Sequence, residues 1–487
     1  MEVPETISTR QVEQWNHHAD VVVIGQGVAG SCAALEARNA GAEVLIVERA
    51  SGGGGASAMS SGIFYLGGGT AVQKACGYDD TADEMYKFLF ASTQPANPQA
   101  VREFCDNSAA HFDWLEELGV PFERTEFKGK AVFLNSTECL FVTGNEKAWP
   151  FNEIAKPAPR GHKVAGTGEN AGAVAMNAIL ARCAEANIPA LYDTRVTAMV
   201  VDDEGRVAGL RARQAGKDIY IAARRGVILA TGGFNLNKEM VRHYLPLVSD
   251  PAEPLGIPSN DGFGLLLGQS VGGVLAAMDG VIATASIYPP AQLIKGIIVN
   301  KRGERFVAED AYHGRTASFV MEQPDQTAWL IVDSSIFAYP EIETHQHRLV
   351  DGYETVAEME TGLGIPTGAL QRTLDNYNRD AASGCDRRFF KQQEWLQPLD
   401  SGPYAAFDIS FNKSIYLYIT LGGLNTDSYG RVLDRDHNPV KGLYAAGACT
   451  AHIPQSGKAY ASGQSLGPGS WFGRIAGRHA ATAEPRP

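Results

Sequence analysis

Residues 20–30 of the chain read DVVVIGQGVAG, and they carry the strongest local indication of the fold. Its first part, DVVVIG, is a run of β-branched apolar residues that is typical of a strand buried on both faces. The residues that follow, VAGSCAALEARNAG (28–41), have helical spacing, and EVLIVE (43–48) predicts a second buried strand. Strand, helix and strand in this order predict a βαβ unit in a parallel sheet.

Three glycines at the strand–helix junction predict a dinucleotide site. Gly25, Gly27 and Gly30 have the G-x-G-x-x-G spacing. Gly25 permits the tight turn, Gly27 lets a pyrophosphate approach the backbone, and Gly30 lets helix and strand pack closely. The helix N-terminus then offers free N–H groups to the phosphates. Glu48 ends the second strand, where its carboxylate can accept hydrogen bonds from a ribose; the alternative is a solvated carboxylate.

The segment after the second strand favours FAD over NAD. SGGGGASAMSSGIFYLGGGT (51–70) is rich in glycine and small residues, which let an extended cofactor pass close to the backbone. An NAD domain has no need of such a segment, and a flexible loop is the alternative. Residues 196–234 then predict three short strands and a buried strand that ends in ATGG. KGLYAAGACT (441–450) repeats the pattern of an apolar strand followed by glycine.

These motifs resemble the FAD-binding fold of the fumarate reductase and 3-ketosteroid dehydrogenase flavoprotein superfamily. The resemblance rests on the first glycine fingerprint, on 51–62, on ATGGF (230–234) and on GLYAAG (442–447), and it covers nearly the whole chain. It implies an α/β fold, in which a Rossmann-like FAD-binding domain of the glutathione-reductase type carries an inserted α+β substrate-capping domain. The implied parts are the first part of the FAD-binding domain (1–274), the inserted catalytic or capping domain (275–415) and the C-terminal part of the FAD-binding domain (416–487).

The resemblance also implies which residues contact the FAD. They lie on the glycine fingerprint, the end of the second strand, the small-residue segment and the later strand ends: Gly25, Gly27, Val28, Ala29, Gly30, Glu48, Arg49, Ser57, Ser61, Gly62, Val196, Ala230, Thr231, Gly232, Gly447, Ser465 and Leu466. Some relatives attach FAD covalently to a histidine in the segment corresponding to 51–62. This chain has no histidine there, so non-covalent FAD is expected.

Composition narrows the partners. The formal net charge of −13 argues against nucleic acid or an anionic membrane as a main partner. No stretch approaches the roughly 18 apolar residues that span a bilayer, so no transmembrane segment is expected. The seven cysteines are scattered without a C-x-x-C pair, which predicts no metal site and a reducing compartment, the cytoplasm.

Dehydrogenation beside a carbonyl requires a group that stabilises the enolate, a base for the α-proton and a flavin that accepts hydride. RGERFVAEDAYHGR (302–315) resembles the family's active-site stretch in the capping domain. Fumarate reductases carry an arginine acid there, whereas this chain has Tyr312 and His313, with Arg315 slightly later and expected to be a salt-bridge partner. His313 is the alternative to Tyr312 as the functional group.

A second stretch, YITLGG (418–423), corresponds to the place where fumarate reductases use a histidine on a substrate carboxylate. Tyrosine and isoleucine in its place remove that cation. This departure from fumarate reductases and the one at 302–315 both count against a small dicarboxylate substrate. Tyr418, Gly422 and Gly423 are expected to contact the substrate.

The third stretch, KAYASGQSLGPGSWFGRIAG (458–477), resembles the C-terminal signature of 3-ketosteroid dehydrogenases. By this analogy Tyr460 donates a hydrogen bond to the substrate ketone. Enzymes that desaturate carbons 1 and 2 have glycine where this chain has Ser462 and Gln464. A serine there resembles the 3-ketosteroid Δ4-(5α)-dehydrogenases, and it implies that Ser462 is the base for the carbon-4 proton, relayed through Tyr312.

The sequence therefore predicts an FAD-dependent oxidoreductase whose partners are a hydrophobic 3-ketosteroid and an external electron acceptor. The alternatives are a 3-ketosteroid Δ1-dehydrogenase, a flavin-dependent reductase of an activated alkene, and a non-catalytic FAD-fold binding module. The intact cofactor segments argue against the last of these. Ser462 also has an alternative as a small loop residue.

Overall fold

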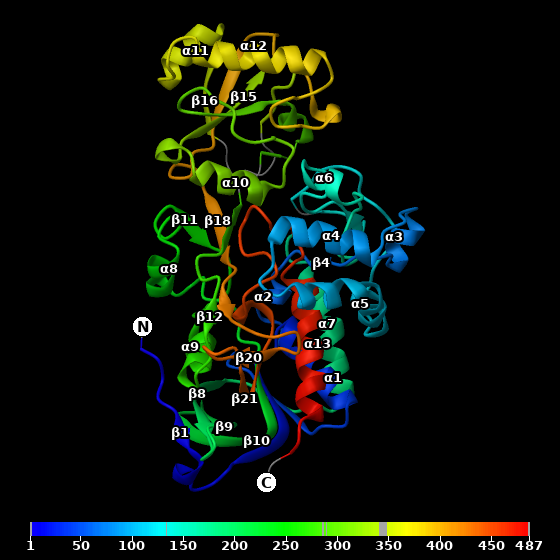
Figure 1. Cartoon of the computed structure of the whole chain (residues 1–487), viewed down its shortest axis with the longest axis vertical. Coiled ribbons are helices and arrows are strands. Elements are labelled where there is room, and N and C mark those ends of the chain that lie inside the picture. Colours follow the sequence, from blue (N-terminus) through cyan, green and yellow to red (C-terminus); the bar gives the residue numbers. More distant parts are fainter. Residues whose placement is uncertain (1, 133, 285–286, 289, 340–347, 486–487) are drawn as a thin grey trace.

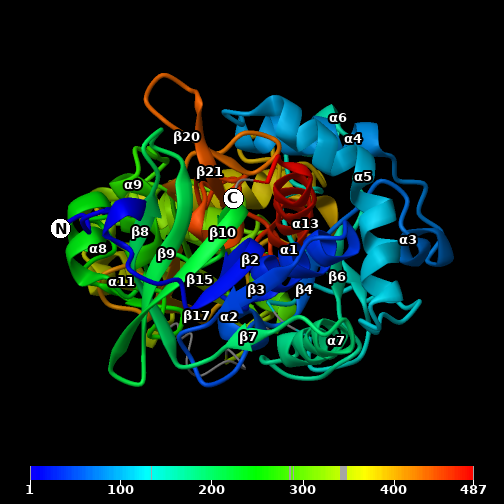
Figure 2. The ribbon, with the colours of Figure 1, turned by 90° about the horizontal axis from the view of Figure 1, so that it is seen from below.

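A nine-stranded sheet forms the base of the molecule (Figures 1 and 2). The computed structural model describes residues 2–132, 134–284, 287–288, 290–339 and 348–485. The strands follow the order β1–β8–β9–β10–β2–β3–β7, and β21 pairs with both β10 and β20. Their bounds are β1 (Ile7–Ser8), β2 (His17–Ile24), β3 (Val44–Val47), β7 (Ala190–Leu191), β8 (Thr194–Val201), β9 (Val207–Gln214), β10 (Lys217–Leu229), β20 (Arg431–Leu433) and β21 (Pro439–Ala445).

Strand β2 lies in the interior of this sheet, between β10 and β3, and its residues from Ala19 to Ile24 are all buried. It pairs in parallel with β3 and with the end of β10, and β10 pairs in parallel with β21. Leu229 is in register with both Ile24 and Ala445, so three strands end side by side. Open parallel sheets bind ligands outside such carboxyl ends, and this edge positions the site.

Helices α1 (Val28–Asn39) and α13 (Leu466–Thr482) lie side by side over one face of the sheet, next to α7 (Gly172–Glu185) (Figures 1 and 2). Glycine allows α13 to approach α1 closely. A Cβ atom at Gly473 would lie 2.3 Å from the Ala29 carbonyl oxygen, and one at Gly477 would lie 2.1 Å from that of Ala33. The two ends of the FAD-binding unit are thus joined through backbone contact.

A second group of elements lies beside these helices (Figure 1). Its three-stranded antiparallel sheet has the order β4–β6–β5 and joins the small-residue segment to the loop before α7. The bounds are α2 (Gly55–Ala58), β4 (Ile63–Tyr65), α3 (Ala71–Ala75), α4 (Ala82–Thr93), α5 (Pro98–Glu117), β5 (Leu140–Phe141), α6 (Phe151–Ile154) and β6 (Gly161–Lys163).

The opposite end of the long axis carries a separate α+β layer (Figure 1). Its antiparallel sheet has the order β14–β15–β17–β16, and α11 and α12 lie across it. The bounds are β14 (Ile297–Asn300), α10 (His313–Met321), β15 (Ala328–Asp333), β16 (Arg348–Tyr353), α11 (Val356–Leu363), α12 (Ala369–Ala382) and β17 (Tyr404–Asp408). The predicted fold class is confirmed.

A three-stranded sheet connects the two ends, with the order β11–β18–β13. Strand β13 comes from the predicted insertion, whereas β11 and β18 come from the flanking parts, so the connection crosses both predicted boundaries. The boundaries at 275 and 415 stay predictions. The remaining bounds are α8 (Lys238–Tyr244), β11 (Ala252–Pro254), α9 (Phe263–Ser270), β12 (Leu275–Ala276), β13 (Val281–Thr284), β18 (Tyr416–Thr420) and β19 (Gly423–Leu424).

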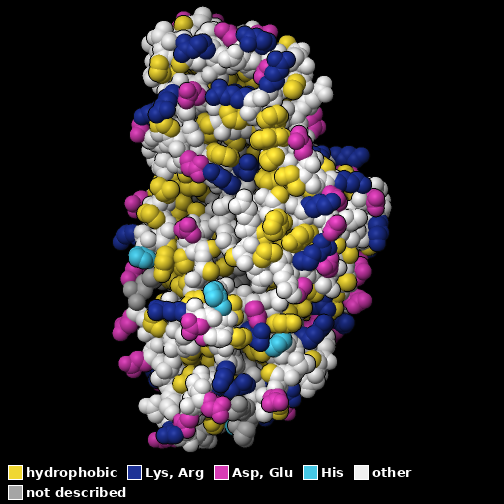
Figure 3. All heavy atoms as spheres, viewed as in Figure 1, with side chains coloured by type: hydrophobic (Ala, Val, Ile, Leu, Met, Phe, Trp, Pro, Cys, Tyr) yellow, Lys and Arg dark blue, Asp and Glu magenta, His cyan; other side chains and the backbone are white. Residues whose placement is uncertain are grey.

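The surface in Figure 3 shows acidic and basic side chains interspersed over the visible face. Among the described residues, no helix has the length and apolar character needed to cross a membrane.

Candidate active site

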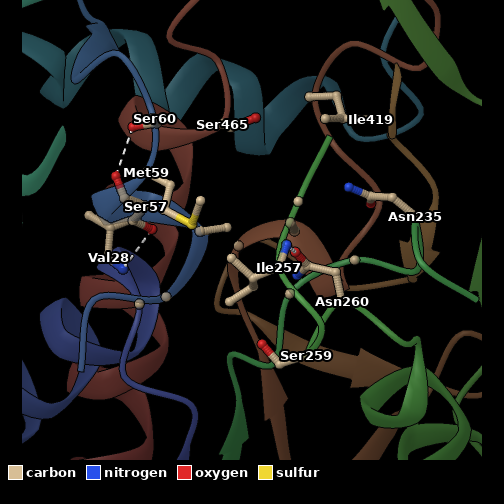
Figure 4. A pocket seen from close by; sticks show the side chains of 18 of the residues that line it. Val28, Ser57, Met59, Ser60, Asn235, Ile257, Ser259, Asn260, Ile419 and Ser465 are labelled. Carbon is tan, nitrogen blue, oxygen red and sulfur yellow. Dashed lines mark hydrogen bonds between the residues drawn. The ribbon is translucent and has the colours of Figure 1, made fainter. Parts of the chain in front are cut away.

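One cavity of about 650 Å³ runs from the carboxyl ends of β2, β10 and β21 to the α+β layer. Figure 4 shows part of it from close by, with Ser57 and Met59 on one wall and Ile257 and Asn260 on the other. The sheet end is lined by backbone and small residues, and the far end by tyrosine and aliphatic side chains. A single continuous space therefore joins the predicted nucleotide site to the predicted catalytic residues.

Most of the predicted FAD contacts line this cavity. They are Gly25, Gly27, Val28, Ala29, Glu48, Arg49, Ser57, Ser61, Val196, Ala230, Thr231, Gly232, Gly447, Ser465 and Leu466. Gly30 and Gly62 are not on its wall. A Cβ atom at Gly30 would lie 1.9 Å from the Gly25 carbonyl oxygen, and one at Gly62 would lie 2.8 Å from Val164 Cγ2. These two glycines allow close packing behind the wall.

The polar groups at the sheet end suit a pyrophosphate and a ribose. Gln26 Oε1 is buried, and it has no hydrogen-bond partner within the described part of the chain. Gly27 is the N-cap residue of α1 and provides no side-chain cap, and the Val28 N–H donates to Ser57 Oγ over 3.1 Å (Figure 4). Phosphate oxygens are the natural acceptors for N–H groups at such a helix start. The residues present therefore fit FAD.

Glu48 is buried, so it is not the solvated carboxylate that the sequence left open. Its two oxygens accept hydrogen bonds from the backbone N–H groups of Gln26 (2.7 Å) and Ala50 (2.8 Å). The neighbouring Arg49 forms an ion pair with Asp261 at 2.6 Å. The Glu48–Gln26 contact holds the end of β3 against the glycine fingerprint, and the Arg49–Asp261 pair holds it against the segment before α9.

Tyr312, Tyr460 and Ser462 meet at the far end of the cavity. Tyr312 comes from the α+β layer, where it is the N-cap residue of α10, and the other two come from the loop before α13. The Tyr312 hydroxyl lies 3.0 Å from Ser462 Oγ, and the Tyr460 hydroxyl lies 2.9 Å from Ser465 Oγ. The two phenol rings are 6.3 Å apart between centroids. The structure thus brings together the three residues predicted to be catalytic.

Burial keeps both phenols neutral. It raises the pKa of Tyr312 well above the usual range, and the neighbouring Tyr460 phenol raises it further. Burial likewise raises the pKa of Tyr460. A neutral phenol retains its proton, so each hydroxyl is available at neutral pH as a hydrogen-bond donor.

Of the three residues predicted to contact the substrate, one lines the cavity and two do not. Tyr418 lines the cavity, and its hydroxyl donates to the Asn235 carbonyl oxygen over 3.0 Å. Gly422 and Gly423 do not reach the wall. A Cβ atom would lie 2.3 Å from the Ala277 carbonyl oxygen at Gly422, and 2.5 Å from that of Cys449 at Gly423. Their α-carbons are packed against backbone, and their contact with substrate stays a prediction.

Arg315 was expected to form a salt bridge, and the described residues provide none for it. Its Nη1 donates to the Lys458 carbonyl oxygen over 3.3 Å, and its guanidinium lies over the Phe151 and Phe319 rings. Burial lowers its pKa. His313, the alternative to Tyr312, also lines the cavity.

The sequence did not identify several other wall residues. Asn235 directly follows the ATGGF motif, a position that could have been found. Its amide accepts from Thr420 Oγ1 over 2.9 Å and donates to the Leu255 carbonyl oxygen over 2.5 Å. Ile419 belongs to the YITLGG stretch, whereas further wall residues carry no motif of their own, among them Ile257, Asn260, Ile282 and His452.

Known proteins match the chain over most of its length. Residues 20–464 match the family described as "FAD binding domain". The chain is similar to the crystal structure of 3-ketosteroid-Δ4-(5α)-dehydrogenase from Rhodococcus jostii RHA1 in complex with 4-androstene-3,17-dione. The TM-score is 0.93 at 39% identity, over 98% of this chain and 100% of that one.

Two sequence relatives lie further away. The 3-oxo-5-alpha-steroid 4-dehydrogenase of Comamonas testosteroni is 29% identical, over 89% of this chain and 93% of that protein. A probable fumarate reductase of Shewanella frigidimarina is 28% identical, over 95% of this chain and 74% of that protein.

The cofactor should be released by denaturation. We expect the protein to purify yellow, and acid or heat to free its FAD into the supernatant, because 51–62 contains no histidine. Absorbance of the supernatant and the pellet after precipitation measures this. Flavin that stays with the precipitated chain would reveal a covalent link and contradict the prediction.

Proposed function

We propose that this chain, which belongs to the FAD binding domain family, dehydrogenates a 3-keto-5α-steroid between carbons 4 and 5. The chain is an FAD-dependent oxidoreductase of the kind that acts on CH–CH groups. The observation that carries the choice of substrate is the Tyr312–Ser462 hydroxyl pair, which lies in one buried space with Tyr460.

FAD supplies the hydride acceptor for such a reaction. The chain's own residues act on the proton and on the ketone. Ser462 Oγ takes the proton from carbon 4 while its own hydroxyl proton moves to the Tyr312 oxygen, 3.0 Å away, and the Tyr312 phenol proton leaves to water. Because a serine hydroxyl is a weak base, this transfer requires a carbon acidified by the neighbouring ketone.

Tyr460 provides that acidification. Its raised pKa keeps the phenol protonated, so its hydroxyl donates a hydrogen bond to the carbon-3 oxygen as negative charge develops there. Ser465 Oγ, at 2.9 Å, orients this hydroxyl.

The walls around these groups suit a rigid hydrocarbon skeleton. Ile282, Leu417 and Ile419 line the same end of the cavity, and Tyr312, Tyr460, Ile282 and Leu421 pack as one apolar cluster. Apolar walls with a few convergent hydroxyls are typical of sites that bind a hydrophobic ketone. The solved relative with 4-androstene-3,17-dione supports this choice of substrate.

An anaerobic titration tests the proposal. Purified holoprotein is mixed with 5α-androstane-3,17-dione, and the visible flavin absorbance is followed. We expect bleaching and a 4-ene-3-ketone product, whereas the matching 3-hydroxy steroid leaves the oxidised spectrum unchanged. A 1-ene product would identify a Δ1-dehydrogenase, and unbleached flavin would contradict steroid dehydrogenation.

The cytoplasmic location and the external electron acceptor stay predictions from the sequence, as do the division of the chain at 275 and 415 and the roles of the individual site residues.

A further inference from the structure

Residues 143–146 (TGNE) form a turn between β5 and α6 that the sequence analysis did not single out. The turn lies behind the cavity wall. The Glu146 side chain closes it, since Glu146 Oε2 accepts a hydrogen bond from the Gly144 N–H over 3.0 Å. Thr143, Asn145 and Glu146 are all buried. We call it the 143–146 turn.

The 143–146 turn holds the Ser462 backbone directly. The Ser462 N–H donates to the Thr143 carbonyl oxygen over 3.0 Å. The turn also packs closely against the neighbouring Ala461, because a Cβ atom at Gly144 would lie 2.6 Å from Ala461 Cβ. A side chain at position 144 would therefore displace the loop that carries Tyr460 and Ser462.

The same turn also holds Tyr312. Asn145 Oδ1 accepts a hydrogen bond from the Tyr312 N–H over 3.0 Å, and this bond is buried. Asn145 Nδ2 donates to the Lys458 carbonyl oxygen over 3.4 Å. One amide side chain thus contacts both segments that carry the hydroxyl pair.

We propose that Asn145 is a positioning residue, and that the 143–146 turn sets the separation of the Tyr312 and Ser462 hydroxyls. This inference rests on the proposed function of that pair. The two residues come from different parts of the chain, so their 3.0 Å contact depends on how the α+β layer sits against the loop before α13. The 143–146 turn forms hydrogen bonds both to Tyr312 and to the loop that carries Ser462.

Proton transfer between hydroxyls depends steeply on their separation. A displacement of about 1 Å can lower a rate about a hundredfold. Asn145 is not on the cavity wall, so its loss should slow proton removal from carbon 4 while steroid affinity stays unchanged.

The test uses the holoprotein with Asn145→Ala. The matched control is Asn378→Ala, because Asn378 also makes one donor and one acceptor contact to backbone, both with Leu399, far from the cavity. Lys130 Nζ still donates to the carbonyl oxygens of Asp310 and Ala311 in the variant, which keeps residues 310–311 attached.

The first readout is amide hydrogen exchange, which requires no substrate. We expect exchange at the Tyr312 amide to become about tenfold faster in Asn145→Ala, since its acceptor is lost. In Asn378→Ala the increase should appear near Leu399 instead. Unchanged protection at Tyr312 would overturn the proposed contact.

The second readout is flavin reduction by a 3-keto-5α-steroid. We expect the limiting rate in Asn145→Ala to fall by up to about a hundredfold, with the steroid dissociation constant unchanged and a larger isotope effect from deuterium at carbon 4. A rate equal to that of Asn378→Ala would overturn the positioning role. A wild-type protein that is not reduced by steroid would instead overturn the proposed function, and the exchange result would still stand.

Asn145→Asp keeps the inference testable if the alanine variant does not fold. It has nearly the same shape and retains an acceptor for Tyr312, but its carboxylate faces the Lys458 carbonyl oxygen. We expect faster exchange at 456–462 and preserved exchange at Tyr312. If Asn145→Asp exchanges no faster than wild type at 456–462 or at Tyr312, and its flavin is reduced at the wild-type rate, the proposal is overturned.

Discussion

Ser462→Ala is expected to slow flavin reduction by a 3-keto-5α-steroid about 10²- to 10⁴-fold, the range that a positioned general base contributes. The substitution removes the Oγ that lies 3.0 Å from the Tyr312 hydroxyl. The loop should keep its backbone conformation, because the N–H at position 462 still donates to the Thr143 carbonyl oxygen in the variant. Steroid binding and FAD content should therefore be retained.

Anaerobic stopped-flow mixing measures this effect, with the steroid at saturating concentration. Ser456→Ala is a suitable control, since Ser456 is an exposed serine in the same loop. Substrate deuterated at carbon 4 should react more slowly with the unmutated protein. A 1-ene product, or a variant as fast as the control, would remove Ser462 from the mechanism and favour Tyr312 as the direct base.

Tyr460→Phe is expected to cost about 3 kcal/mol in the barrier, or about a hundredfold or more in rate, the usual loss for one donor to a developing oxyanion. Phenylalanine keeps the ring that packs against Tyr312, Ile282 and Leu421. The variant should therefore fold, bind FAD and still bind steroid. The substitution removes the proposed hydrogen bond to the carbon-3 oxygen and the 2.9 Å contact with Ser465 Oγ.

The comparison for this variant is Tyr416→Phe. Tyr416 is also buried, and its hydroxyl donates to the Ile409 carbonyl oxygen over 2.6 Å, but it is not on the cavity wall. Single-turnover reduction rates and flavin content of both variants separate a catalytic loss from the cost of deleting any buried hydroxyl. Equal rates would make Tyr460 a packing residue.

The nucleotide end of the site could be predicted because its signal is local. Residues 20–48 hold strand, turn, helix and acid in one contiguous stretch, and the structure places them as expected. Gly422 and Gly423 show the limit of this approach, because a glycine on the cavity wall and one behind it look alike in sequence. Only the positions of Ala277 and Cys449 distinguish them.

Asn145 could not be predicted for a related reason. Its hydrogen bond to Tyr312 joins residues 167 positions apart, and a buried amide that satisfies backbone groups has no periodic pattern. Arg315 likewise was expected to meet a carboxylate and instead donates to a backbone carbonyl. Contacts of this kind depend on how separate segments pack, which residue types alone do not determine.

The contact between α1 and α13 has a consequence for biosynthesis. Helix α1 starts at Val28, but the backbone that covers it comes with Gly473 and Gly477. Folding during translation proceeds from the N-terminus, so the early strands and α1 are made long before their partner. Until α13 emerges from the ribosome, the apolar face of α1 is uncovered. Because Ser465 and Leu466 at the start of α13 line the cavity, the flavin site is complete only after this last helix has been made.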